Sequence, residues 1–182
     1  MRLFASIALP PEVADHLSQA LVMVGQPGTR TPWLPVENWH ITLAFYGEKP
    51  DGLVDELASN LDQVAFRQPP FELALAGAGI FRHEIGWIGV NDPAEQLARL
   101  ATVARGSWAG ENQHAQNRFH VTVSRSKRRS NLADTMAALS IYRGPAWVVD
   151  SISLYRSDLG EGVSGHPLYS SLHSSTLSSA SA

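Results

Sequence analysis

The chain has 182 residues, of which 44% are apolar, so it is long enough for one domain with its own hydrophobic core. It contains no cysteine, which excludes disulfides, thiolate metal sites and cysteine nucleophiles. Its formal net charge of −3 argues against a protein that coats long stretches of nucleic acid. No segment approaches the roughly 20 apolar residues of a membrane span. We therefore expect a soluble, cytoplasmic protein.

Hydrophobic periodicity divides the chain into alternating strands and helices. Strands are expected, in chain order, at residues 3–9, 40–46, 71–76, 85–90, 119–124 and 146–155. Helices are expected after Pro10-Pro11, after Pro50-Asp51-Gly52, after Asn91-Asp92-Pro93 and across residues 132–139. The tail from Ser174 to Ala182 is of low complexity and is expected to be disordered, which leaves residues 1–173 as a single domain.

The two halves of the chain repeat this order of elements. The interval from Leu9 to His40 is 31 positions, and the interval from Val90 to His120 is 30. Each interval contains a helix started by proline and ends in a strand led by histidine. The pattern predicts an α+β fold in which a strand–helix–strand–helix–strand unit occurs twice, giving two pseudo-symmetric lobes around a central cleft.

The two histidine-led strands share one motif of histidine, apolar residue, threonine, apolar residue. The first reads His40-Ile41-Thr42-Leu43 and the second His120-Val121-Thr122-Val123. With seven histidines and seven threonines in the chain, one such motif should arise by chance only roughly 0.05 times. Because side chains alternate on a strand, each histidine shares a face with its threonine, while the apolar pair faces the other way.

This pair of motifs has the groups needed to open a cyclic phosphodiester. One group must deprotonate water and another must protonate the departing ribose oxygen, and two imidazoles with ordinary pKa values near 6.5 can do both at neutral pH. The hydroxyls of Thr42 and Thr122 can donate hydrogen bonds to the non-bridging phosphate oxygens. Such an arrangement requires no metal.

The chain resembles the 2H phosphoesterase superfamily, and within it the RNA 2′,3′-cyclic phosphodiesterases, also called 2′-5′ RNA ligases. The resemblance extends from Met1 to about Leu172. It rests on Met1-Arg2-Leu3-Phe4, on Glu37 to Gly47, on Phe119 to Arg125, and on Leu154 to Gly160 with the later Tyr169. Members of the family commonly have a Gly-Pro-Gly-Gly-like run after Leu-Gly. This chain departs from it with Gly160-Glu161-Gly162-Val163-Ser164-Gly165.

The resemblance implies a bilobal enzyme, expected to be monomeric, that hydrolyses RNA 2′,3′-cyclic phosphate ends to 2′-phosphates without metal or ATP. In the implied mechanism, His120 activates water and His40 protonates the leaving 3′ oxygen. The joining of such an end to a 5′-hydroxyl through a 2′-5′ bond is expected to be the weaker, reverse activity.

Other site residues are expected on weaker grounds. Phe45 matches the aromatic position that stacks the terminal base, and Arg125 matches the basic residue after the second motif. Strict alternation would turn Arg125 away from His120, so its role requires the strand to end or bulge there. Tyr155 either closes one wall of the cleft or ends the last strand. A basic cluster, which is either an RNA contact or a solvated face, comprises Arg118, Arg125, Lys127, Arg128 and Arg129.

Three alternatives remain open from the sequence. The same site could act on small cyclic nucleotides or on 2′-5′-linked oligonucleotides. The protein could instead be a non-catalytic module that binds nucleotides or RNA ends, although binding alone does not need two titrating groups. A histidine metal site is the last alternative, and the absence of a nearby carboxylate pattern weakens it.

Overall fold

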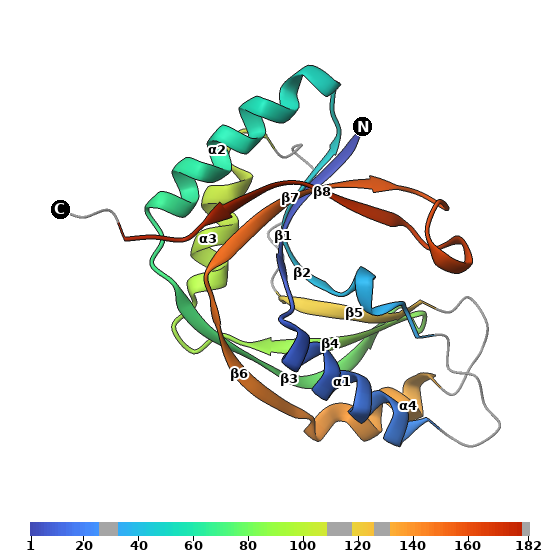
Figure 1. Ribbon diagram of the computed structural model, residues 1–182. Helices are drawn as coiled ribbons and strands as arrows, with labels where there is room; N and C mark the ends of the chain where they lie inside the picture. The colour runs from blue at the N-terminus through green and yellow to red at the C-terminus, as the bar shows by residue number, and fades with distance from the viewer. Residues whose placement is uncertain (26–32, 109–117, 126–131, 180–182) are drawn as a thin grey trace.

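The computed structural model describes residues 1–25, 33–108, 118–125 and 132–179 (Figure 1). Its strands are β1 (Arg2–Ala8), β2 (His40–Glu48), β3 (Phe71–Phe81), β4 (Ile85–Asn91), β5 (His120–Arg125), β6 (Arg143–Val149), β7 (Ser151–Asp158) and β8 (Leu168–Thr176). Its α-helices are α1 (Pro11–Val24), α2 (Val54–Phe66), α3 (Gln96–Arg105) and α4 (Leu132–Ala138). The mixed α+β class expected from the sequence is confirmed.

The eight strands form one curled sheet, in the order β6-β3-β4-β5-β2-β1-β7-β8. Every neighbouring pair is antiparallel. The two histidine-led strands, β2 and β5, therefore lie side by side at the centre of the sheet. We call β2, β1, β7 and β8 the His40 half, and β5, β4, β3 and β6 the His120 half.

The helices that follow the first strand of each repeat cross to the other half of the sheet. Helix α1 follows β1 and packs against β6, whereas α3 follows β4 and packs against β2. Helix α2 covers β7 and β8, and α4 covers β3 and β4. Figure 1 shows α2 and α3 together on one side of the sheet, with α1 and α4 near its other end. This exchange ties the two halves together through one continuous core, in which Leu17, Ile41, Leu97 and Val121 are fully buried.

The repeat holds for the paired strands β1–β2 and β4–β5, but the later strands follow a different path. Strand β3 leaves the first repeat and pairs with β4 and β6 in the His120 half. The expected long strand at 146–155 was wrong: it is two strands, β6 and β7, separated at Asp150. Strand β6 pairs with β3, and β7 pairs with β1 and β8, so the chain changes from one half of the sheet to the other at this residue.

The expected disordered tail is also wrong at its start. Ser174 to Thr176 continue β8, which pairs with β7 along its length. Leu177 is buried, and its backbone N–H donates to the carbonyl of Asp150 over 2.7 Å. Serine-rich composition misled the prediction because strand pairing uses backbone groups, which any side chain except proline leaves available. Residues 180–182 lie outside the described part.

Candidate active site

The two motifs meet on one face of the central strands. Ile41 of β2 pairs with Val121 of β5, and both are fully buried on the opposite face. Continuing this antiparallel register by one residue sets each histidine across from the threonine of the other motif. Four half-buried polar side chains therefore form a pseudo-symmetric square: His40, Thr42, His120 and Thr122.

A cavity of about 470 Å³ opens on this square. Six residues expected from the sequence line it: His40, Thr42, Phe45, His120, Thr122 and Arg125. Eight further lining residues were not identified as site residues: Arg2, Phe4, Leu34, Asn38, Ser157, Leu159, Pro167 and Tyr169. The structure therefore brings together groups from both halves of the sheet and from the loop that joins β7 to β8.

Each histidine is oriented in the same way by a backbone carbonyl two residues before it. The Nδ1 atom of His40 lies 2.9 Å from the carbonyl oxygen of Asn38, and that of His120 lies 2.9 Å from the carbonyl oxygen of Arg118. A carbonyl oxygen only accepts hydrogen bonds, so Nδ1 carries the proton in both rings and Nε2 is the nitrogen that exchanges protons. Both imidazoles are thus prepared for acid–base chemistry at Nε2.

Aromatic rings hold each imidazole from the side. The centroid of His40 lies 4.9 Å from that of Phe4 and 5.2 Å from that of Tyr169, whose ring is nearly perpendicular to it. In the other half, His120 contacts Phe81 edge to face, with centroids 5.1 Å apart. Such contacts restrict the rotation of the rings and reduce their access to water.

Desolvation lowers the pKa of both imidazoles. Desolvation lowers the pKa of His40 from 6.5 to about 4, with smaller contributions from the neighbouring charges of His120 and Arg125. Desolvation also lowers the pKa of His120, and Arg125 and Arg118 add to the effect. Both rings are therefore neutral at pH 7 before a ligand binds.

Two β-bulges place Phe45 and Arg125 in the cavity. Across β1 and β2, Ser6 pairs with Thr42 and Phe4 pairs with Phe45, so the strand contains an extra residue between Thr42 and Phe45. The same shift occurs in β5, and it turns Arg125 to the face of His120 instead of the opposite face. Phe45 and Arg125 each lie five residues after their histidine, and the two bulges fall at matching positions between them.

Phe45 has a cationic neighbour that the sequence did not reveal. The guanidinium of Arg2 lies 4.6 Å from the centroid of the Phe45 ring and covers one of its faces. Only the other face of the Phe45 ring can stack on a base while Arg2 keeps this position.

Tyr155 does not line the main cavity. Its ring stacks on Phe4 at a centroid distance of 5.5 Å, so it supports the ring that contacts His40. Arg118 stacks its guanidinium on Trp87, 5.0 Å from the ring centroid. Three residues of the expected basic cluster, Lys127, Arg128 and Arg129, lie outside the described residues.

The loop with the unusual glycine pattern is fixed to the first motif. The side-chain amide of Asn38 donates to the carbonyl of Pro167 over 2.8 Å, while the backbone carbonyl of Asn38 accepts the hydrogen bond from Nδ1 of His40. Gly162 donates its N–H to the carbonyl of His166, and a Cβ at Gly162 would lie 2.8 Å from that oxygen. Glycine is needed there because the two backbone segments approach so closely.

Within the described residues, no three His, Asp or Glu side chains lie close enough to hold a metal ion. The described helices include none that is long and apolar enough to cross a membrane. Two imidazoles, two threonine hydroxyls and two guanidinium groups line this one cavity, and such a set of groups can bind an anion and move protons.

Comparison with known proteins agrees with this chemistry. A family model described as LigT like Phosphoesterase matches residues 7–86. The RNA 2′,3′-cyclic phosphodiesterase of Escherichia coli strain K12 is 31% identical over 166 residues, which cover 88% of this chain and 89% of that protein. Its counterpart from Methanothermobacter thermautotrophicus is 25% identical over 168 residues, covering 87% of this chain and 91% of that protein.

The chain also matches solved structures of LigT. The crystal structure of E. coli LigT complexed with 3′-AMP matches with a TM-score of 0.74 at 26% identity and covers 97% of both chains. The chain belongs to the LigT-like phosphoesterases of the 2H superfamily. Its curated relatives described above are named RNA 2′,3′-cyclic phosphodiesterases, as the sequence resemblance predicted.

Proposed function

We propose that this protein hydrolyses 2′,3′-cyclic phosphates at RNA 3′ ends to 2′-phosphates, with His40 and His120 as its acid–base pair. The observation that carries the proposal is the matched orientation of the two imidazoles, whose Nδ1 atoms are both fixed by carbonyls and whose rings both line one cavity. We further propose a monomeric cytoplasmic enzyme that uses neither a metal nor a nucleotide cofactor.

The chemistry is a displacement at phosphorus. Nε2 of His120 removes a proton from water, the water oxygen forms a bond to phosphorus, and the bond from phosphorus to the 3′ oxygen breaks. Nε2 of His40 gives its proton to that oxygen, so the products are a 2′-phosphate and a 3′-hydroxyl. If a 5′-hydroxyl takes the place of water, the product is a 2′-5′ linkage, so the same site could also perform ligation.

The low pKa of His40 opposes its role as acid, because an acid must carry a proton. Substrate binding raises the pKa of His40 again. The phosphate brings a negative charge between the two imidazoles, and an opposite charge within about 4–6 Å favours the protonated form. We therefore assign the acid role to His40 in the loaded cleft, where proton uptake accompanies binding.

Three side chains stabilise the charge that develops on the non-bridging oxygens. Thr42 and Thr122 lie beside the histidines and donate from their hydroxyls, and Arg125 lines the same cavity. Arg125 acts on the pKa of both His40 and His120, which supports a position beside the reacting phosphate. That a relative was crystallised with 3′-AMP supports a nucleotide as ligand.

The proposal is tested with a short RNA that ends in a 2′,3′-cyclic phosphate, incubated with purified protein in EDTA. The wild type is expected to release a 2′-phosphate, and His40→Ala and His120→Ala are each expected to abolish turnover. His16→Gln serves as the matched control, because His16 lies on α1 and contacts Tyr142 away from the cavity. Binding without turnover would favour the non-catalytic module, and loss of activity in EDTA would favour a metal site.

A second substrate separates the acid from the base. In a cyclic phosphorothiolate with sulfur at the 3′ bridging position, the thiolate leaves without protonation because its pKa is near 8.5. His40→Ala should regain much of the wild-type rate on this substrate, and His120→Ala should not. The opposite pattern of rescue would exchange the two roles.

A further inference from the structure

The cleft contains more positive charge than a cyclic phosphate needs. Among the described residues that line it, Arg2 and Arg125 are cationic and none carries a carboxylate. A 2′,3′-cyclic phosphate has one negative charge, and both histidines are neutral before it binds. One guanidinium therefore remains without an anionic partner when only the cyclic phosphate is bound.

The two arginines lie at different distances from the reacting centre. Arg125 lowers the pKa of His40 and of His120 through its charge, whereas Arg2 acts on neither and lowers only the pKa of the half-buried Tyr169, which desolvation raises. Arg2 stacks on Phe45, which follows Thr42 beyond the bulge of β2. Two strand positions correspond to about 7 Å, so Arg2 lies farther out along the cleft.

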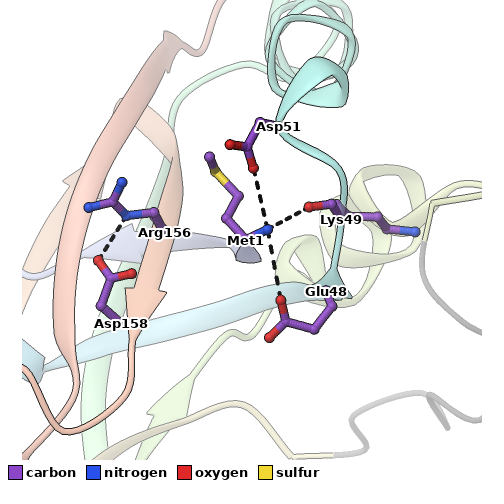
Figure 2. Close-up of polar contacts among 6 residues, drawn as sticks. All are labelled: Met1, Glu48, Lys49, Asp51, Arg156 and Asp158. Atoms are coloured by element: carbon purple, nitrogen blue, oxygen red, sulfur yellow. Dashed lines mark hydrogen bonds and ion pairs between the residues drawn. The ribbon is translucent and has the colours of Figure 1, made fainter.

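Three carboxylates on neighbouring segments form ion pairs with groups other than Arg2. Glu48, its register partner on β2, has its carboxylate 3.8 Å from the amino group of Met1, and Asp51 lies 3.6 Å from the same group. Asp158 at the end of β7 pairs with Arg156 at 2.8 Å. Figure 2 shows these contacts, in which the acidic groups point to Met1 and Arg156. Among the described residues, Arg2 has no ion pair within 4.0 Å.

We propose that Arg2, supported by the ring of Phe45, binds a second phosphate one nucleotide step from the cyclic phosphate. This phosphate is the one attached to the 5′ oxygen of the terminal nucleotide, either as a phosphodiester of an RNA chain or as a terminal 5′-phosphate. Arg2 thus makes the enzyme prefer cyclic ends with a 5′ phosphate group over plain nucleoside 2′,3′-cyclic phosphates. The inference rests on the proposed function and defines its substrate more narrowly.

The planar guanidinium suits this task. It presents several N–H donors in a fixed fork that matches phosphate oxygens, and stacking on an aromatic ring fixes the plane of the fork before the ligand arrives. A lysine keeps the charge and loses both the fork and the stacking. Charge alone and preorganised geometry can therefore be separated by substitution.

The test compares kcat/KM on four substrates: adenosine 2′,3′-cyclic phosphate, its 5′-phosphorylated form, a dinucleotide ending in the cyclic phosphate, and the same dinucleotide with an uncharged methylphosphonate linkage. The wild type should prefer both charged substrates by at least about tenfold, and the methylphosphonate should behave like the plain nucleotide. A preference for only one charged substrate would identify the source of the second phosphate. Equal rates on all four would overturn the inference.

The variants assign the preference to Arg2. Arg2→Ala should reduce the ratio of kcat/KM values to below about twofold, and Arg2→Lys should keep an intermediate ratio. Arg156→Ala is the matched control, because Arg156 is outside the cavity lining and its charge is paired with Asp158. A preference that survives in Arg2→Ala, or that disappears equally in Arg156→Ala, would contradict the assignment.

If no substrate is turned over, the proposed function fails, but the second phosphate site can still be tested by a binding measurement. The affinities of adenosine 2′-phosphate and adenosine 2′,5′-bisphosphate are measured by calorimetry. The wild type should bind the bisphosphate at least about tenfold more tightly, and Arg2→Ala should bind both equally. Equal affinities in the wild type would refute the second phosphate site.

Discussion

The buried His40 should make the protein less stable in mild acid. Its pKa is about 4 in the folded protein and 6.5 in an ordinary setting, a difference that corresponds to roughly 3 kcal/mol once both states have titrated fully. Between these values the unfolded chain binds more protons than the folded one, so a fall in pH favours unfolding. At pH 5 the expected loss from His40 alone is about 2 kcal/mol.

The assay is urea denaturation of the wild type and His40→Gln at pH 7.5 and pH 5.0. Groups that titrate in both proteins cancel in the comparison, so the wild type should lose about 2 kcal/mol more than the variant between the two pH values. His120→Gln should remove a further part of the acid sensitivity, since burial also lowers the pKa of His120. If His40→Gln loses as much stability as the wild type, the imidazole is not desolvated and the reasoning fails.

Three further outcomes are expected. Thr42→Val and Thr122→Val should each lower kcat by about 10², because each removes one hydroxyl donor, and the serine variants should retain most activity in the same assay. Gly79→Ala should lower the free energy of unfolding by about 1–3 kcal/mol, because a Cβ there would lie 2.3 Å from the Trp87 ring. Since that ring contacts His120, kcat should fall as well, whereas Gly52→Ala, with nothing within 4 Å of its Cβ, should change neither.

The sequence alone was sufficient to identify the two motifs that meet at the cavity. The two motifs predicted that His40 and Thr42 share one face of a strand and that His120 and Thr122 share one face of another, because alternation is a local property of an extended backbone. The spacing from Leu9 to His40 and from Val90 to His120 predicted equivalent positions for the two strands, which pair with each other at the centre of the sheet.

Strand pairing beyond the repeat depended on tertiary structure. Aspartate is disfavoured in strands, so Asp150 is a weak local signal, but nothing local shows that the chain changes there from one half of the sheet to the other, because the segments on both sides have the residue preferences of strands. The place of Ser174 to Thr176 in β8 also depends on distant partners: the backbone of β7, and Asp62 of α2, which accepts a hydrogen bond from the Ser175 hydroxyl.

The remainder of the site also depended on contacts distant in sequence. The bulges that turn Phe45 and Arg125 into the cavity arise from pairing with β1 and β4, so a single strand read alone leaves their direction open. Arg2 and Tyr169 come from opposite ends of the chain and reach the cavity because β1 and β8 flank β7 in one curled sheet. The sequence determines which side chains of the two motifs share a strand face, and the sheet determines which groups surround them, because side-chain alternation is local and strand order is not.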